Sequence, residues 1–598
     1  MKETPLLQFI KRTVHDPRAE KIVHGASVIL LILSLWLPPA SAGSRMLHLD
    51  VPLITKAGGA VSAVDGAQLL IPEGALTQQL RLEMTALSRL DFLSGAGDSI
   101  ADEAAEAMSA EPATVRGEHV YRFQPYGPSP AAAILTLPLP EGIDPNLADL
   151  YVWDEEKWKW ASGHVILEDG VIEAHLDSLP SVAAVVEARR LNPAVAAVLE
   201  DDADLAEKAA TALAESAFLD HNRGVRLAEA EVPSTPVTML SRINPDGFYL
   251  NADGTVSCAQ SADWVSVPQG YFVLPIVSNR QGGAVQPGIL DTVLVDPETR
   301  EKSIGSLTNL AVEKGYAGLQ LDYRELDPIH RQEFASFVTE LADSLHAQGK
   351  LLTVRVEEPT RISEDLWETG GYDWQTLGKA VDTLVIPAID SPSAYAAGGQ
   401  MEALLGWAIG QVNRTKLQIA VSVYSFKTVA GVSTRIPYLQ ALSEVAQLAV
   451  KGDKKIVGSG EDVTLLLPKL CDCGGLQYDE DTSTYWLAYD DEQGRECQIW
   501  LENATSVAHK LELVVDYNIR GMTLENVFAE QSDERVLDLL RHFRRLIIPP
   551  MHSKFTVTWT IQGPSGEKAT TAVLPLEEPG YIWHAPDAPG DYTIAASV

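Results

Sequence analysis

The stretch Gly315-Tyr316-Ala317-Gly318-Leu319-Gln320-Leu321-Asp322-Tyr323-Arg324 decides the fold of this 598-residue chain. Its small and apolar residues predict a buried strand, and the carboxylate that follows gives the strand a polar end. Similar runs recur at 271–277, 318–322, 351–356, 383–386, 417–423 and 521–523. Helical segments such as 330–348 and 436–450 alternate with them. We therefore predict a parallel (β/α)8 barrel, a TIM barrel, over residues 233–546.

The quoted stretch, together with Leu274-Pro275-Ile276-Val277-Ser278-Asn279, resembles family 18 glycoside hydrolases of the bacterial branch that acts on chitin or spore-wall peptidoglycan. Later segments resemble the remaining strands of that family in the correct order. The resemblance implies a site at the carboxyl ends of the strands. It also implies substrate-assisted hydrolysis, in which one glutamic acid at the end of the fourth strand protonates the leaving oxygen.

The residues that perform this chemistry in the family are replaced here. The family's Asp-Gly-x-Asp-x-Asp-x-Glu falls on residues 317–324, where only Gly318 and Asp322 match. Arg324 occupies the position of the acid, and an arginine side chain does not give up its proton in proteins. The resemblance therefore implies a barrel without its general acid.

Two further family positions differ. The tyrosine that helps to hold the reaction intermediate falls on Ile389, and the tryptophan of the eighth strand falls near Leu524 or Glu525. We expect a pseudoenzyme that keeps the barrel framework and lacks catalytic groups. If activity remains, the candidate catalytic residues are Asp322, Glu325 and Glu525, although Glu325 would have to turn inward against the alternation of a strand.

Polar side chains should still project at the top of the barrel, and we predict a cleft there. Its members are Gln320, Asp322, Arg324, Asp390, Tyr424 and Glu525. One interpretation is a cleft that binds a sugar or another ligand. The other is a structural network in which Arg324 pairs with Asp322 and Asp390 and fills the old active site.

The flanking segments predict further domains. Residues 45–186 show short alternating runs between turn residues, which is typical of a β-sandwich. Within them, Ala57-Gly58-Gly59-Ala60-Val61 and Ile71-Pro72-Glu73-Gly74 resemble the ZU-type sandwich of ankyrins and netrin receptors. Residues 187–232, with Asn192-Pro193 as a helix start, predict an acidic, Ala-rich helical linker. Residues 547–598 resemble an immunoglobulin-like β-module, though they are few for that fold and could pack on the barrel.

The N-terminus predicts a secretory signal peptide over residues 1–42. Basic residues precede the apolar run 25–37, and an Ala-x-Ala site ends at Ala42. An uncleaved membrane anchor is the alternative. Cys473 and Cys497 flank a predicted hairpin (485–489 and 497–501), so we expect a disulfide between them. No histidine accompanies Cys471 and Cys473, which argues against zinc, and we expect no cofactor.

Together these features predict a secreted bacterial protein, extracellular or on the cell surface, that binds cell-wall or other extracellular glycan or acts as a surface structural protein. Its partners would be glycan or other surface proteins. The alternative is an active glycosidase on N-acetylglucosamine-containing glycans, with Glu325 or Glu525 as the acid. The net charge of −36 disfavours nucleic acid, and contact with a membrane is expected only through the signal segment.

Overall fold

The fold is described from a computed structural model of the chain. It describes residues 51–111, 113–154, 156–199, 240–258, 272–363, 366–451, 456–472, 475–491, 493–529, 531–543, 548–551, 553–564, 568–576 and 580–598. The predicted signal peptide lies outside these residues, so it stays a prediction. The chain divides into two compact units, Met1–Arg189 and Arg190–Val598, and each is described by itself.

Two antiparallel sheets build the first unit, as its alternating runs predict. One contains β1 (Leu53–Ile54), β4 (Leu80–Ser88), β6 (His119–Tyr126), β12 (Val182–Ala188), β8 (Ala148–Asp154) and β9 (Lys157–Ser162), with β5 (Ala113–Val115) beside β12. The other contains β10 (His164–Ile166), β11 (Val171–Leu176), β7 (Ala133–Pro138), β3 (Gln68–Ile71) and β2 (Gly59–Ser62). Buried side chains of both sheets share one core, which is the arrangement of a β-sandwich. The ZU-type resemblance stays a prediction.

Two helices that the sequence analysis did not predict interrupt this sandwich. They are α4 (Arg89–Leu93) and α5 (Ser99–Met108). The Asp98 side chain caps α5 by accepting a hydrogen bond from the amide of Ala101 at 2.9 Å. Trp158 of β9 donates its indole N–H to the carbonyl of Ala104 at 2.8 Å. The helices therefore form a second small core on the outer face of one sheet.

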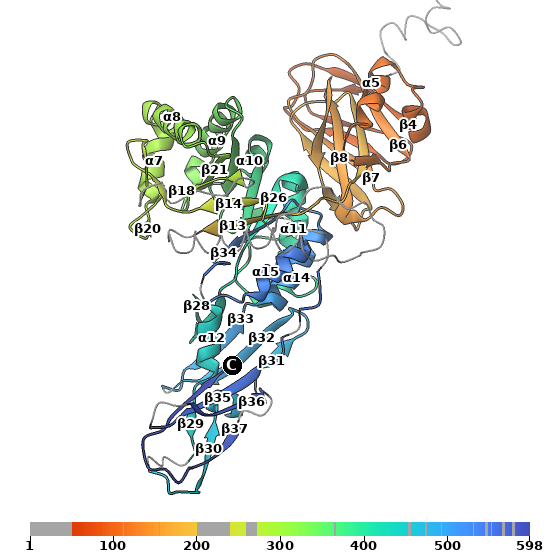
Figure 1. Cartoon of the computed structure of the whole chain (residues 1–598). Coiled ribbons are helices and arrows are strands. Elements are labelled where there is room, and N and C mark those ends of the chain that lie inside the picture. The colour runs from red at the N-terminus through yellow and green to blue at the C-terminus, as the bar shows by residue number, and fades with distance from the viewer. Residues whose placement is uncertain are drawn as a thin grey trace, which may run out of the picture. The chain divides into compact units, whose positions relative to one another are not determined.

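A closed ring of eight parallel strands organises the described part of the second unit. In ring order the strands are β13 (Ala194–Leu199), β14 (Arg242–Pro245), the interrupted strand β17 (Phe272–Val273) and β18 (Ile276–Ser278), β21 (Gly318–Asp322), β22 (Leu351–Arg355), β25 (Thr383–Pro387), β26 (Leu417–Ser422) and β34 (Gly521–Glu525). The ring closes where β34 lies beside β13 (Figure 1). These two strands pair in parallel, and Gly521 is opposite Ala194. The predicted (β/α)8 barrel is therefore present.

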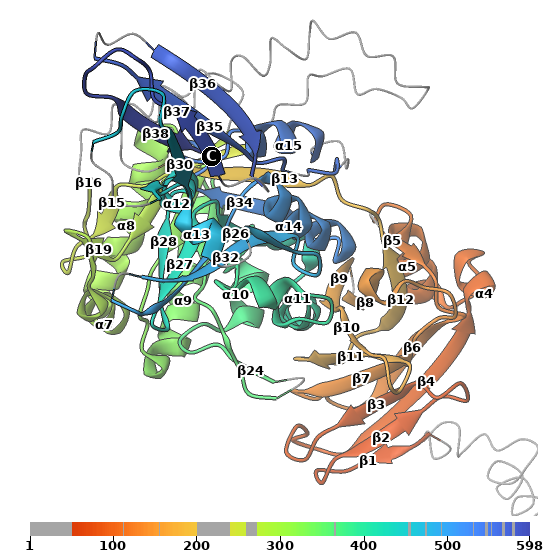
Figure 2. The same ribbon diagram turned by 90° about the horizontal axis from the view of Figure 1, so that it is seen from below.

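Helices surround this ring. They are α7 (Pro287–Val295), α8 (Pro297–Glu313), α9 (Arg331–His346), α10 (Trp374–Ala380), α11 (Gln400–Gln411), α14 (Ala504–Asp516) and α15 (Arg535–Phe543). Figure 2 shows α9, α10 and α11 in succession beside the barrel strands. Phe334 and Phe337 of α9 belong to the same core as Leu321 of β21, so the apolar helix faces seal the outside of the ring. Among the described residues, no helix is both long and apolar enough to cross a membrane.

The predicted helical linker is wrong at its beginning, because Ala194–Leu199 forms β13, the first barrel strand. Its six residues are all apolar, and a strand buried on both faces has this composition. The Leu191 amide donates to Asn518 Oδ1 at 2.8 Å, which holds the entry to β13 against the end of α14. The rest of the predicted linker, 200–232, lies outside the described residues.

A long insertion separates β26 from β34. Its main sheet is antiparallel and runs in the order β28 (Val432–Ile436), β27 (Ser425–Val429), β33 (Glu496–Leu501), β32 (Thr484–Asp490) and β31 (Gln477–Asp479). The predicted hairpin is confirmed, since Leu487 of β32 pairs with Ile499 of β33. Helix α12 (Tyr438–Val445) covers one face of this sheet, where Lys427 forms an ion pair with Glu444.

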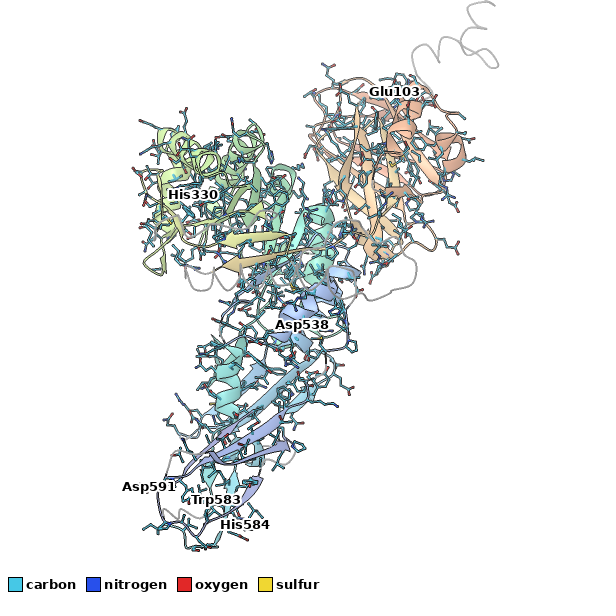
Figure 3. The ribbon with its side chains drawn as sticks, viewed as in Figure 1. Glu103, His330, Asp538, Trp583, His584 and Asp591 are labelled. Atoms are coloured by element: carbon cyan, nitrogen blue, oxygen red, sulfur yellow. The ribbon has the colours of Figure 1, made fainter. Side chains whose placement is uncertain are left out.

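The C-terminal tail joins this insertion instead of forming a module of its own. β37 (Gly580–His584) pairs with β30 (Asp462–Leu466), which also pairs with β29 (Ala449–Val450), while β35 (Thr556–Gln562) lies between β36 (Lys568–Pro575) and β38 (Thr593–Ser597). Trp559 is fully buried in the same core as Leu487. Figure 3 labels Trp583 and His584 at the far end of this joint β-domain. The prediction of a separate immunoglobulin-like module is wrong, because so short a tail cannot bury enough apolar surface alone.

Candidate functional site

The fourth strand of the barrel, β21, positions the centre of the site. β21 and β22 approach so closely that a Cβ atom at Gly318 would lie 2.0 Å from the carbonyl oxygen of Leu351. Only glycine, which has no Cβ atom, therefore fits at this position. Leu319 and Leu321 belong to the outer core. Because side chains alternate along a strand, Gln320 and Asp322 face the barrel axis.

Gln320 lies in the interior of the barrel, below Asp322. It is fully buried, and its Oε1 accepts a hydrogen bond from Asn244 Nδ2 at 2.9 Å. In the same interior, Arg242 donates to Thr353 Oγ1 at 3.0 Å and also to Gln418 Oε1. Gln320 therefore belongs to a polar layer that fills the barrel, and its predicted place in the cleft is wrong.

Asp322 and Arg324 form an ion pair at the mouth of the barrel. Arg324 Nη2 donates to Asp322 Oδ2 at 3.0 Å, and Arg324 Nε also contacts Oδ1, so the guanidinium holds both carboxylate oxygens. The backbone of Arg324 is fixed by Asn279, whose Oδ1 accepts from its amide at 2.8 Å and whose Nδ2 donates to its carbonyl at 2.9 Å. These two hydrogen bonds thus hold the backbone of residue 324, which the sequence resemblance aligns with the family's acid.

Asp322 stays ionised although it is only 8 % exposed. Burial by itself would raise the pKa of this carboxyl, but the charge of Arg355 and the hydrogen bond and charge of Arg324 outweigh burial, so the pKa lies below its ordinary value. The carboxylate is therefore a fixed negative centre between two arginines.

Glu325 does not turn into the barrel. Its φ of 54° is in the left-handed region, which ends the alternation of β21, and the residue is exposed. Its amide donates to Glu357 Oε1 at 3.1 Å. Glu325 therefore cannot take the place of the missing acid with this backbone geometry.

Carboxylates and guanidinium groups continue across the mouth as a chain of ion pairs. Arg355, at the end of β22, contacts Glu525, at the end of β34. Arg435 of the insertion strand β28 lies 3.3 Å from Glu525 Oε2 and 2.6 Å from Asp390 Oδ1. The predicted pairing of Arg324 with Asp390 is thus wrong, because the insertion supplies Arg435 to Asp390 instead.

The remaining predicted positions lie around this chain of ion pairs. Tyr424 is half-buried just beyond β26, and its amide donates to Ser422 Oγ at 3.3 Å. Ile389, at the family's tyrosine position, is 6 % exposed and packs in the outer core, as does the fully buried Leu524. The sequence resemblance aligns this position with the family's intermediate-binding tyrosine, and the side chain found here is a buried hydrocarbon.

Sequence analysis missed Arg355, Arg435 and Glu358. Arg355 ends a strand that was predicted, so its place at the mouth follows from the barrel alone. Arg435 reaches the mouth through the register of the inserted sheet, for which the sequence carried no signal. Burial raises the pKa of Glu358, and the negative charge of Asp390 raises it further. Glu358 is thus a carboxyl at this face whose pKa lies above its ordinary value.

The cysteines do not contribute to the mouth. Cys497 of β33 is a buried free thiol whose Sγ donates to the carbonyl of Arg495 at 3.5 Å. The predicted disulfide is therefore wrong, because Cys497 is free, while its predicted partner, Cys473, lies outside the described residues. Among the described residues, no group of three potential ligand side chains could hold a metal ion.

Residues 281–527 match the family described as glycosyl hydrolases family 18. This chain contains a family 18 glycosyl hydrolase-like domain. The match begins just after β18 and ends just beyond β34, so it includes the ion-paired mouth and the whole insertion. The matched residues are thus similar to a family of glycan-acting hydrolases.

Several proteins similar to the family 18-like domain are bacterial. YdhD of Bacillus subtilis (strain 168), named as a sporulation-specific glycosylase, is 24% identical over 255 residues, which cover 42% of this chain and 56% of YdhD. The cortical fragment-lytic enzyme of the same organism is 19% identical over 292 residues, covering 48% of this chain and 64% of the enzyme. The chain therefore spans less than two thirds of the length of these relatives. A chitinase from Chromobacterium violaceum covers 58% of this chain and 97% of its own, with 21% identity and a TM-score of 0.44.

Proposed function

We propose that this protein binds a cell-wall or other extracellular glycan through its family 18-like domain and does not hydrolyse it. The observation that carries the proposal is Arg324, which occupies the acid's position and grips Asp322 with two hydrogen-bonding contacts. A guanidinium group has donors only and keeps its proton, so it can bind sugar hydroxyls but cannot protonate a leaving oxygen.

The other carboxylates that sequence analysis offered as acids support the same proposal. Glu525 accepts from Arg355 and Arg435 together, so both of its oxygens are engaged. Glu325 is exposed outside the alternation of β21. Loss of a general acid typically removes about 10²- to 10⁴-fold of rate. The buried Ile389 adds a second defect, since it offers no hydroxyl to an intermediate.

Residual hydrolysis is the second candidate function, and the raised pKa of Glu358 favours it. A raised pKa keeps a carboxyl protonated to a higher pH, which suits general-acid catalysis. Glu358 follows the fifth strand at the same face as Asp390. It would act on N-acetylglucosamine-containing glycans, the substrate class that the family resemblance implies.

We also propose that the protein works outside the cell, with residues 1–42 removed. A net charge of −36 suits a soluble extracellular protein that avoids other polyanions. Glycan is the partner that the family 18-like domain favours. Other surface proteins remain alternative partners.

The test uses protein recovered from the medium of a bacterial culture that expresses the full chain. Mass spectrometry should give a mature N-terminus at Gly43, and a start at Met1 would contradict export with cleavage. Calorimetry with N-acetylglucosamine oligomers and purified peptidoglycan should detect binding. Assays of new reducing ends should detect no release above the blank.

Variants separate the two candidate functions. If the wild type releases sugar and one of the variants Glu358→Gln, Glu325→Gln or Glu525→Gln does not, the non-catalytic proposal is overturned. The variant that loses the activity then identifies the acid. Arg324→Glu restores an acid at the family position, yet little activity should return without the tyrosine. Arg324→Gln is its matched control, because it removes the charge without adding an acid.

A further inference from the structure

Three neighbouring barrel strands each bring an arginine to the mouth. Arg280 follows β18, Arg324 follows β21, and Arg355 ends β22. Ser278 of β18 pairs with Asp322 of β21. Arg280 and Arg324 each stand two residues beyond this pair, on strands about 4.8 Å apart. The two arginines therefore start from adjacent points of the rim.

Asn279 fixes the backbones of these two arginines beside each other. Its buried side chain accepts from the amide of Arg324 at 2.8 Å and donates to the carbonyl of Arg324 at 2.9 Å. Arg280 comes next in the sequence and begins β19 (Arg280–Gln281), which pairs with β20 (Ala284–Val285) as a small hairpin. Hydrogen bonds on both sides thus determine where the Arg280 side chain begins.

Arg280 differs from the other arginines of the mouth in having no carboxylate partner among the described residues, and it is exposed. The paired arginines are Arg324 with Asp322, Arg355 with Glu525, and Arg435 with Asp390. Arg324 uses its Nε and Nη2 for this pairing, and no described group accepts from its Nη1. Neighbouring strands therefore supply two guanidinium groups with unused donors.

The charge of Arg280 acts on the same place as that of Arg324. Burial would raise the pKa of Asp322, but the positive charges of Arg355, Arg324 and Arg280 outweigh it. The Arg280 guanidinium is thus close enough to influence this carboxylate. Asp322 is already held by Arg324, so Arg280 keeps its capacity for a second carboxylate.

Further round the ring, the mouth is acidic. Asp390 follows β25 and Glu358 follows β22, and both side chains are exposed. Glu357 lies before them, where it accepts from the Glu325 amide at 3.1 Å and from the Tyr372 hydroxyl at 3.3 Å. These carboxylates repel an anionic group of a ligand. An anion at the mouth is therefore directed toward Arg280 and Arg324.

A carboxylate is the ligand group that fits these donors. The planar fork of a guanidinium matches the two oxygens of a carboxylate, and charge-assisted hydrogen bonds of this kind are about twice as strong as neutral ones. One carboxylate also neutralises the one unpaired arginine. A polyanion would be repelled by the net charge of −36, so the acidic groups of the ligand have to be isolated.

We propose that Arg280 and Arg324 form a receptor for the carboxylate of an acidic sugar residue, so that the mouth selects glycans with isolated carboxylates over neutral glycans. This inference rests on the proposed function and deepens it by naming the class of glycan. Two kinds of sugar supply such a group. One is N-acetylmuramic acid whose lactyl group carries no peptide, and the other is a uronic acid.

The test compares calorimetric affinities of the mature full-length protein for matched pairs of disaccharides. Each pair consists of an acid and its carboxamide, one pair containing N-acetylmuramic acid and the other glucuronic acid. An acid that the receptor recognises should bind about tenfold more tightly than its carboxamide. This preference should shrink in concentrated salt, which screens the charge of the exposed Arg280.

Variants of Arg280 test the receptor itself. Arg280→Gln should abolish the preference for the acid, whereas Arg280→Lys keeps the charge without the fork and should retain part of it. Lys314→Gln is the matched control, because Lys314 is an exposed cation that precedes β21 and so lies at the opposite end of the barrel. It should retain the full preference. Thermal unfolding checks that each variant is folded.

The outcomes separate this inference from the proposed function. A preference for only one of the two acids supports the receptor and identifies the source of the carboxylate. If the wild type binds acid and carboxamide equally well, or if the preference survives in Arg280→Gln or disappears in Lys314→Gln, the receptor is wrong and the proposed function stands. If the wild type binds none of the disaccharides and no N-acetylglucosamine oligomer, both proposals fall.

Discussion

Asp322 remains charged because two arginines offset the cost of burying it. Its folded-state pKa is below the ordinary value, so the unfolded chain takes up the proton first when the pH falls. The stability that this carboxylate contributes is therefore complete above its ordinary pKa of about 3.9. It is lost as the pH falls through the lower, folded-state pKa.

Asp322→Asn should show this dependence directly. At neutral pH the variant leaves Arg324 without its partner, and the free energy of unfolding should fall by about 2 to 4 kcal/mol. Between about pH 5 and 3 its stability should change less steeply with pH than that of the wild type. Urea denaturation across this range measures both effects. Glu313→Gln, an exposed carboxyl at the end of α8, is the control, and equal acid slopes for Asp322→Asn and wild type would contradict the argument.

Single residues also show where sequence analysis stops. Arg324 at the acid position could be read from the motif. The direction of Glu325 could not, because it depends on one φ angle of 54°. The partner of Asp390 could not be predicted either, because the position of Arg435 depends on the pairing of β28 with β27 in a long insertion. Short-range patterns predict a strand, whereas contacts between distant segments depend on register.

Among the elements, β21 was predictable and β13 was not, although both are buried parallel strands. Along β21, apolar and polar side chains alternate, and the carboxylate at its end marks the barrel mouth. β13 follows an Asn-Pro pair and precedes an Ala-rich acidic stretch, so helix signals on both sides outweighed its six apolar residues. Short apolar runs do not distinguish a strand from a helix by periodicity alone.

The close approach of β21 and β22 can be tested at Gly318. Gly318→Ala would bring a Cβ atom to within 2.0 Å of a backbone oxygen, which cannot be relieved by rotating a side chain. We expect the free energy of unfolding to fall by about 3 kcal/mol or more, or folding to fail. Urea denaturation and soluble yield measure the effect.

Gly288→Ala in α7 is the matched control for this substitution, because nothing lies within 4 Å of its missing Cβ atom. In a helix, alanine in place of glycine should stabilise the protein by about 0.5 kcal/mol or more. If Gly318→Ala were as stable as Gly288→Ala, the barrel register described here would be incorrect.

At the scale of the whole molecule, the insertion and the C-terminal tail share one core, so removing the tail should loosen the insertion. A chain that ends at residue 552 lacks β35 to β38, and with them Trp559, Val557 and Ile561 of the joint core. Hydrogen exchange should then show that the amides of β32 and β33 lose protection, while those of β21 and β22 keep it. A chain ending at Tyr592 lacks only the edge strand β38 and should retain most of the protection.

An independent C-terminal module would behave differently. Removing it would leave exchange in β32 and β33 unchanged, and that result would restore the immunoglobulin-like interpretation that the structure replaces.

The pairing of Ala194 with Gly521, and of β30 with β37, also limits the order in which the parts of the chain can fold. Residues 53–188 contain every described strand of the first unit, so that unit can fold before the barrel strands are available. β13 emerges directly afterwards and has to wait for β34, and the insertion has to wait for almost the last residues made. Its apolar strands are exposed throughout this interval. The second unit is therefore the part of the chain that we expect to be most prone to aggregation before folding is complete.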